Sequence, residues 1–243
     1  MDAENVEKFD IFFLGLFLAA QVIGVLSLLL VSYWCISFAG GFGLSAGLLF
    51  QWHPLFATIG MVYLLGNAIL MFRIFHSQPK HTLKRIHAAV NIVGLVFTMV
   101  AVLVVFLRPH RSGKVYLYSM HGWLGLLAII LYVLQAVVSV AAFLLDAVSN
   151  QMKICLIPVH IYLGHAIFIL GIGAAVTGVN ETAIFKLKMS YSKLGNEAIL
   201  FNCIGILFTF FGLIVVYLST NIHNKKLPLL QNSLQLRNTL SIT

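Results

Sequence analysis

The sequence predicts an all-α fold, a six-transmembrane-helix bundle, on the strength of its composition and the length of its apolar runs. Of the 243 residues, 60% are hydrophobic and only 9% are charged, a balance typical of a membrane protein and not of a soluble domain. Apolar runs of about 20 residues, long enough to cross a hydrocarbon core of about 30 Å as a helix, recur along the chain. Inside lipid every backbone polar group must be paired within its own segment, which favours helices over open strands.

Charge breaks divide the chain into six apolar spans, each expected to form one helix. The first span follows an acidic N-terminal segment and is expected to be retained, since a cleaved signal peptide would begin with positive charge. A glycine-rich, uncharged stretch before the second span is expected to be a loop at the membrane surface. The expected spans are residues 11–34, 48–72, 86–107, 119–144, 155–178 and 197–219. They form one domain over 1–243, with its core at 11–220 and short N- and C-terminal tails.

The distribution of Lys and Arg predicts that both termini are cytoplasmic. With the N-terminus inside, nine of the fifteen basic residues lie on the cytoplasmic side, in accord with the positive-inside rule. The net charge of +8 therefore reflects topology, and no basic helix face with stacking aromatics predicts a nucleic-acid partner. The outer basic residues lie in two loops, as either lipid-headgroup anchors or a site for an anionic ligand.

Five of the nine histidines lie inside the spans, where a titratable side chain is costly and a functional role is the default expectation. The second to fifth spans each carry one near the N-terminal end: His53, His87, His121 and His160. Because successive helices run in opposite directions, His53 and His121 should lie toward the outer side, and His87 and His160 toward the cytoplasm. His165 should point about 140° away from His160 on a helix of 3.6 residues per turn, so we expect it to be structural.

This alternation of helix direction predicts two layers, each with two histidines that face one another across a four-helix core. Two imidazoles on opposite helices are the axial ligands of a six-coordinate haem, which has no free coordination position and favours electron transfer. Without a CxxCH site, non-covalent haem b is expected. The central four helices, the second to the fifth, would hold two haems, one on His53 and His121 and one on His87 and His160, as a two-step electron path across the bilayer.

Other readings of these histidines stay open. Each histidine could make a helix-to-helix hydrogen bond, although four at paired depths favour a common site. A haem-free metal-ion or proton transporter lined by histidine would be expected to place carboxylates in the membrane, and all seven acidic residues lie outside the predicted helix centres. A bis-haem anchor for a larger complex is the third reading, and the basic clusters on both faces count against it.

Motifs around the histidines resemble those of the eukaryotic cytochrome b561 family over residues 50–220. The matching segments are Trp52-His53-Pro54, Asn67 to Arg73, Lys84-Arg85-Ile86-His87, Tyr118 to Trp123 and Pro158-Val159-His160. The resemblance implies the same histidine pairs, each with one haem b, and a homodimer. It also implies an ascorbate-dependent transmembrane oxidoreductase, which takes electrons from cytoplasmic ascorbate and reduces ferric iron or monodehydroascorbate on the other side.

Two sets of residues are substrate-binding candidates. The cytoplasmic candidates are Arg73, Lys80, Lys84 and Lys153. Charge-assisted hydrogen bonds from these cations suit ascorbate, a monoanion at neutral pH, and the resemblance implies that they form the ascorbate site; the positive-inside rule alone would also place them there. The outer acceptor candidates, in the loop before His121, are His110, Arg111, Lys114, Tyr116 and Tyr118.

Two further segments bear on the cellular location. Gly178-Val179-Asn180-Glu181 and the tail from Leu227 to Leu230 resemble the lysosomal branch of the family. They favour an endosomal, lysosomal or other endomembrane, and the plasma membrane stays open. Asn180 begins a glycosylation sequon that falls outside by the predicted topology but close to the membrane, so we expect it to be unused.

Overall fold

The computed structural model describes residues 3–107 and 117–221, with side chains from residue 11 onward. In this part of the chain the structure is all-helical, and six helical segments are long and apolar enough to cross a membrane. These segments are Ile11–Ser37, Leu49–Ile74, Lys80–Leu107, Met120–Leu144, Asn150–Lys193 and Asn196–Thr220. The predicted fold class and number of spans are confirmed.

Three of the spans are single helices: α1 (Ala3–Ser37), α4 (Lys80–Leu107) and α7 (Asn196–Thr220). The second span joins η1 (Leu49–Gln51), α2 (Trp52–Ala57), the π-helix η2 (Thr58–Leu64) and α3 (Leu65–Ile74). The fourth joins α5 (Met120–Ser139) and the π-helix η3 (Val140–Leu144), and the fifth joins α6 (Asn150–Leu187) and η4 (Lys188–Lys193).

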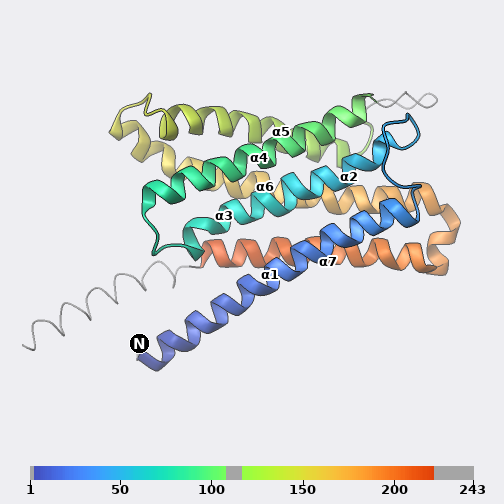
Figure 1. Cartoon of the computed structure of the whole chain (residues 1–243), viewed down its shortest axis with the longest axis horizontal. Helices are drawn as coiled ribbons and strands as arrows, with labels where there is room; N and C mark the ends of the chain where they lie inside the picture. The colour runs from blue at the N-terminus through green and yellow to red at the C-terminus, as the bar shows by residue number, and fades with distance from the viewer. Residues whose placement is uncertain (1–2, 108–116, 222–243) are drawn as a thin grey trace, which may run out of the picture.

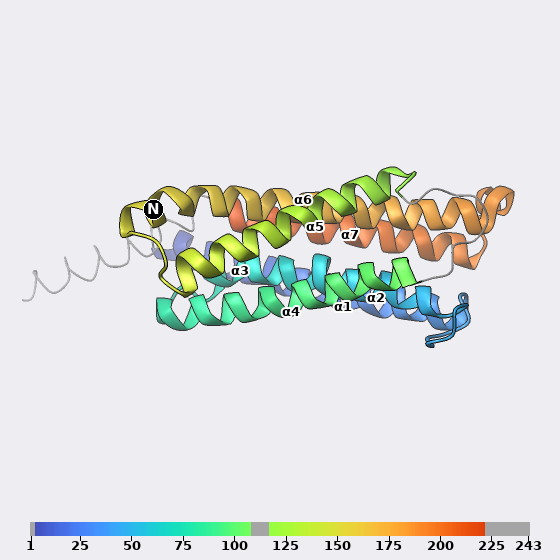
Figure 2. The same ribbon diagram turned by 90° about the horizontal axis from the view of Figure 1, so that it is seen from above.

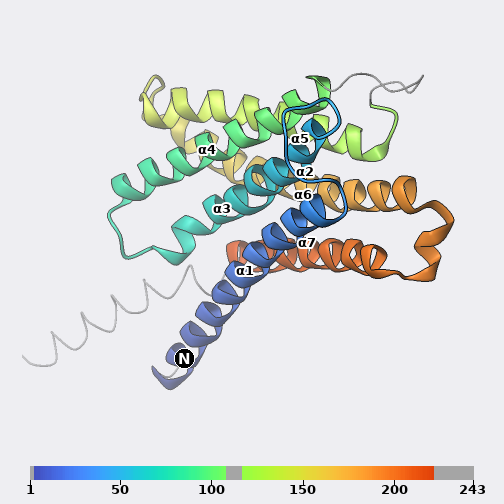
Figure 3. The ribbon, with the colours of Figure 1, turned by 45° about the vertical axis from the view of Figure 1, so that its right-hand side comes forward.

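The helices form two layers, which Figure 2 shows with α5, α6 and α7 on one side and α1 to α4 on the other. The start of α1 lies at the same end of the bundle as the α3–α4 and α5–α6 connections (Figure 1). The α6–α7 turn lies at the opposite end (Figure 3). Successive spans therefore run in opposite directions, as was assumed when the depths of the four histidines were predicted.

The second span approaches α4 very closely. A Cβ atom on Gly60 would lie 2.4 Å from the carbonyl oxygen of Gly94 and 2.9 Å from the amide nitrogen of Thr98. Small residues at a membrane-helix crossing allow backbones to approach in this way. Gly60 lies within η2, and π-helical turns of this kind are often found at functional sites.

The core is aromatic and lies where α6 and α7 meet the second span. Phe168 and Phe211 are fully buried, with ring centroids 6.2 Å apart. A polar network ties α1 to this core: the Gln21 amide donates to Asn67 at 2.8 Å, and the Tyr63 hydroxyl donates to Gln21 at 3.0 Å. Because these groups satisfy one another, their burial in the membrane is not left uncompensated.

The fifth span is longer than the predicted 155–178. Ser149 caps the start of α6 by accepting a hydrogen bond from the Met152 amide, and the helix continues to Leu187. The predicted end was wrong because it was taken from the end of the apolar run. Glu181 and Lys186 interrupt the apolar pattern but not the helix. The glycosylation sequon and Glu181 therefore lie within α6, although the sequence placed them beyond its end.

Candidate functional site

The four predicted histidines lie as two pairs between the two layers of helices. His53 on α2 and His121 on α5 have ring centroids 5.9 Å apart and planes inclined at 81°. His87 on α4 and His160 on α6 have centroids 6.1 Å apart and planes inclined at 71°. Each pair joins one helix of each layer. Each histidine lies toward the N-terminal end of its own helix, and successive spans run in opposite directions, so the two pairs lie toward opposite ends of the bundle.

Both rings of the His53/His121 pair, called the outer pair after the predicted topology, are oriented by backbone carbonyls. His53 Nδ1 donates to the Ala101 carbonyl at 2.9 Å, and His121 Nδ1 donates to the Ala174 carbonyl at 2.7 Å. Since a carbonyl can only accept, the hydrogen is on Nδ1, and each Nε2 keeps a lone pair for a metal ion. Gly178 packs tightly on this pair, because a Cβ there would lie 2.7 Å from His121 Nδ1.

The His87/His160 pair, called the inner pair after the same predicted topology, has one backbone and one side-chain partner. His87 Nδ1 donates to the Ala68 carbonyl at 3.0 Å, whereas His160 Nδ1 lies 2.9 Å from the hydroxyl oxygen of Ser139. Ser139 is the last residue of α5, where the helix changes to the π-helix η3. This hydroxyl was not predicted, because it meets His160 only through the packing of two helices.

The spacing of the rings fits an iron atom held between two imidazoles. An imidazole nitrogen binds a metal ion at about 2.0–2.1 Å, so two such bonds and two ring radii separate the centroids by about 6 Å. Aromatic rings surround the ligands: Phe50 lies 5.5 Å from His53, and Phe143 lies 5.6 Å from His160, centroid to centroid. Among the described residues no group of three or more His, Cys, Asp or Glu could hold a metal ion.

Tyr132 lies on α5, after His121 and before Ser139 in the chain. It is 3% exposed, and its hydroxyl donates to the Asn91 carbonyl at 2.9 Å. Asn91 in turn donates through its amide to the His87 carbonyl at 2.8 Å. These hydrogen bonds link α5 to the part of α4 that carries His87.

The predicted cytoplasmic cations lie at the inner end of the bundle. Lys80 is the first residue of α4, and Lys84 lies one turn before His87 on the same helix. Arg73 is in the last turn of α3. Lys153 follows the start of α6 and comes about two turns before His160.

An acidic residue that the sequence analysis did not single out lies among these cations. The Lys153 amine pairs with the Asp146 carboxylate at 2.8 Å. This hydrogen bond and charge, together with the nearby charge of Lys84, hold the pKa of Asp146 below its ordinary value. Asp146 lies in the connection between the fourth and fifth spans with a positive φ of 53°. It therefore brings Lys84 and Lys153 into one electrostatic cluster.

At the outer end, Tyr118 is the one predicted acceptor residue that the structure describes. His110, Arg111, Lys114 and Tyr116 lie outside the described residues. The Tyr118 hydroxyl donates to Glu181 at 2.6 Å, and its ring packs against Phe185 with centroids 6.0 Å apart. Burial, and then the hydrogen bond and charge of Glu181, raise the pKa of Tyr118 to about 12. Glu181 was missed because the sequence placed it in a loop.

His165 is separate from the pairs, as its spacing predicted. Its Nδ1 donates to the Ile161 carbonyl at 2.7 Å on its own helix. Its Nε2 lies 2.8 Å from the hydroxyl of Ser219 on α7. Both ring nitrogens are thus engaged in packing contacts, which is a structural role.

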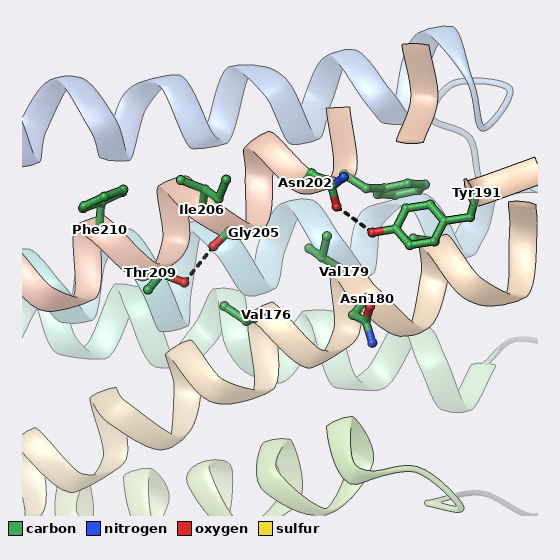
Figure 4. A pocket seen from close by; sticks show the side chains of 11 residues that line it. Val176, Val179, Asn180, Tyr191, Asn202, Gly205, Ile206, Thr209 and Phe210 are labelled. Atoms are coloured by element: carbon green, nitrogen blue, oxygen red, sulfur yellow. Dashed lines mark hydrogen bonds between the residues drawn. The ribbon is translucent and has the colours of Figure 1, made fainter. Parts of the chain in front are cut away.

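A groove between α6 and α7, of about 580 Å³, lies apart from the histidines. Figure 4 shows its lining, in which the Tyr191 hydroxyl donates to Asn202 at 2.5 Å. Asn180, the sequon residue, also lines this groove. No histidine lines it, and its remaining walls are mainly apolar.

The fold and the site together define a class, a helical-bundle membrane protein with paired intramembrane histidines suited to haem. The sequence model of eukaryotic cytochrome b561 matches residues 52–186. The chain belongs to the eukaryotic cytochrome b561 family, as its motifs predicted, and is an integral, multi-pass membrane protein.

Relatives that share most of their length with the chain carry two names. The pig (Sus scrofa) and human (Homo sapiens) proteins named transmembrane ascorbate-dependent reductase CYB561 are 33% and 34% identical to it over 201 residues, which cover 83% of this chain and 80% of each relative. The Xenopus laevis protein named plasma membrane ascorbate-dependent reductase CYBRD1 is 37% identical over 212 residues, covering 86% of this chain and 75% of that protein.

Proposed function

We propose that this protein is an ascorbate-dependent oxidoreductase that carries single electrons across its membrane from cytoplasmic ascorbate to an acceptor on the other side. The observation that carries the proposal is the presence of two histidine pairs at two depths of one bundle, with centroids 5.9 and 6.1 Å apart. The relatives named ascorbate-dependent reductases support the choice of donor.

The cofactor of the family is haem b, and we infer two of them, one held by His53 and His121 and one by His87 and His160. When bound, they would supply one-electron iron chemistry with no free coordination position. The chain contributes the ligands and their orientation, since each Nδ1 is engaged by a partner on a neighbouring helix. Aromatic rings next to the ligands, such as Phe50 beside His53 and Phe143 beside His160, would help to tune the potentials of the haems.

The cytoplasmic cations are proposed to bind the donor. Ascorbate, as a monoanion, gives up one electron and one proton to become monodehydroascorbate, and the proton passes to the cytoplasmic solvent. Lys84 and Lys153, which lie beside Asp146, would orient the anion by charge-assisted hydrogen bonds. Arg73 and Lys80, at the same end of the bundle, complete the proposed site.

The acceptor side, the membrane and the assembly are proposals from the resemblance. The acceptor is ferric iron or monodehydroascorbate, bound at the outer end with Tyr118 and the preceding loop. Both termini face the cytoplasm, the protein is a homodimer in the lipid bilayer, and an endosomal or lysosomal membrane is favoured over the plasma membrane.

A visible spectrum of the purified protein, recorded before and after adding ascorbate, tests this function. We expect a reduced b-type spectrum and about two haems per chain, as two bis-histidine sites require. One haem per chain would remove the two-step path. A protein that binds no haem under conditions where a relative does would return the histidines to a metal-ion or proton transporter.

A further inference from the structure

A carboxylate that the proposed mechanism does not use lies next to the outer histidine pair. Glu181 lies on α6, one turn beyond Gly178, and Gly178 is the residue that packs against His121. Its Oε1 accepts the hydrogen bond of Tyr118, which lies three residues before His121 in the chain. The Glu181 carboxylate on α6 thus contacts the segment that leads into α5, the helix that carries His121.

The second oxygen of this carboxylate accepts no hydrogen bond from the described residues. Glu181 Oε2 is buried, and within residues 3–107 and 117–221 it has no hydrogen-bond partner. A buried acidic oxygen without a partner is costly, and at a membrane helix it points to a role in binding or transfer.

A second carboxylate at the same face shows the contrast. Glu197, at the start of α7, forms an ion pair with Lys186 and accepts a hydrogen bond from the Trp34 indole at 2.8 Å. Its charge is therefore neutralised locally. No Lys or Arg in the described part of the chain forms an ion pair with Glu181, so no direct ion pair offsets its charge beside the outer pair.

We propose that Glu181 determines the charge preference of the outer electron-acceptor site, favouring cationic acceptors and disfavouring anionic ones. This inference rests on the proposed function, since it requires electrons to leave at the outer pair. Each acceptor takes one electron and no proton, and no bond forms or breaks. The electron comes from ascorbate, whose own proton is released at the opposite face.

Two one-electron acceptors of opposite charge isolate this effect: hexaammineruthenium(III), a trivalent cation, and ferricyanide, a trivalent anion. A unit charge about 8 Å from a trivalent ion changes its local concentration about threefold at physiological ionic strength. The effect has opposite signs for the two ions, so Glu181→Gln should lower the cation-to-anion ratio of rate constants about tenfold. Glutamine keeps an oxygen for the Tyr118 hydrogen bond.

The experiment uses the haem-loaded protein in phospholipid vesicles that contain ascorbate, with either acceptor outside. Haem content and reduction by ascorbate are measured first, because their absence refutes the proposed function and not the inference. The matched control is Glu181→Asp, which keeps the carboxylate charge at this position and should leave the ratio close to that of the unmodified protein. The fall in the Glu181→Gln ratio should also diminish as salt is added.

An unchanged ratio in Glu181→Gln, in vesicles that still transfer electrons, would overturn the inference. So would an equal loss of rate toward both acceptors, because that indicates a packing defect and not a charge effect. An equal shift in Glu181→Asp would also overturn it, since the effect would then follow the altered side chain and not its charge.

Discussion

The two histidine pairs differ in what holds them and in what surrounds them. Both outer rings donate to backbone carbonyls, those of Ala101 and Ala174. One inner ring, His160, lies against the Ser139 hydroxyl instead. Backbone carbonyls are part of the helices and cannot be changed by substitution, whereas a hydroxyl is a side chain. The inner pair is therefore the one whose ligand environment can be tuned by a single residue.

The two ends of the bundle also differ in the charged side chains that lie near the histidine pairs. At the inner end, the Asp146 carboxylate is paired with Lys153 and lies near the charge of Lys84. Beside the outer pair, the Glu181 carboxylate accepts a hydrogen bond from the neutral Tyr118 hydroxyl. The cations at the inner end therefore attract an anionic donor, whereas the Glu181 carboxylate locally disfavours anions. This asymmetry suits a path in which electrons enter and leave at chemically different sites.

The largest expected effect is the loss of one haem when an inner ligand is removed. His160→Ala leaves His87 without its partner, so the haem content should fall from about two to about one per chain, and transfer across the membrane should stop. Haem is measured from the reduced spectrum in pyridine, and transfer from ascorbate-loaded vesicles. His165→Ala is the control on the same helix, because the hydrogen bonds of His165 within the described residues go to Ile161 and Ser219, and it should retain both haems. Two haems in His160→Ala would refute the pairing.

A smaller effect is expected when the outer pair is crowded. Gly178→Ala would place a methyl group 2.7 Å from His121 Nδ1, and such overpacking costs about 1–3 kcal/mol. We expect the outer haem to bind about 10–100-fold more weakly, measured by haem loss to apomyoglobin, with the inner haem unchanged. Gly173→Ala is the control on the same helix, since its Cβ would make an ordinary 3.6 Å contact with Leu124. Equal haem loss in both variants would contradict the specific contact.

The difference between carbonyl and hydroxyl partners can be measured as a potential. Ser139→Ala removes the acceptor beside His160 Nδ1, which makes the imidazole a weaker donor to ferric iron. The inner potential should rise by about 30–60 mV, where 59 mV corresponds to a tenfold change for one electron. Spectroelectrochemical titration resolves the two haems, and the outer potential should not move. Ser139→Thr keeps the hydroxyl and should restore the potential; a rise in both potentials would indicate a general packing change.

The smallest effect is expected at the cytoplasmic cations. Lys153→Ala should raise the KM for ascorbate about two- to fivefold, the range of an exposed ion pair, with kcat little changed. Asp146→Asn should lower the KM by a similar factor, because Asp146 occupies Lys153 in the free protein. Initial rates with ascorbate test both variants, and the neutral donor duroquinol is the control because its KM should not respond. A higher KM in Asp146→Asn would mean that Asp146 positions Lys153 and does not compete with the donor.

Much of the fold could be predicted because apolar run length and helix length are both set by the bilayer. The five other spans begin and end within a few residues of their predicted limits, apart from the charged first turns of α1 and α4. The fifth failed because α6 continues past the apolar run to Leu187. Charged residues such as Glu181 leave the hydrophobic pattern without disturbing the backbone hydrogen bonds of a helix, so a hydropathy limit is not a helix limit.

The candidate site was predictable in part. Depth follows from the position of each histidine in its span and from the alternation of helix direction, which needs no coordinates. The assignment of the histidines to haem stays a prediction, and the ring centroids of the two expected pairs lie 5.9 and 6.1 Å apart, close to the separation expected for two imidazoles on one iron atom. Ser139 and Asp146 were not predicted, since neither stands in a motif that marks it as a partner.

The sequence by itself determined the membrane class, the number of spans, the family and the two depths at which histidines occur. These properties depend on composition and on order along the chain. Only the tertiary structure decided which carbonyl or hydroxyl orients each imidazole, that Asp146 joins Lys153, and that Glu197 is neutralised while Glu181 binds Tyr118. Such contacts depend on the rotation and register of neighbouring helices, which packing sets and which periodicity within one helix does not encode.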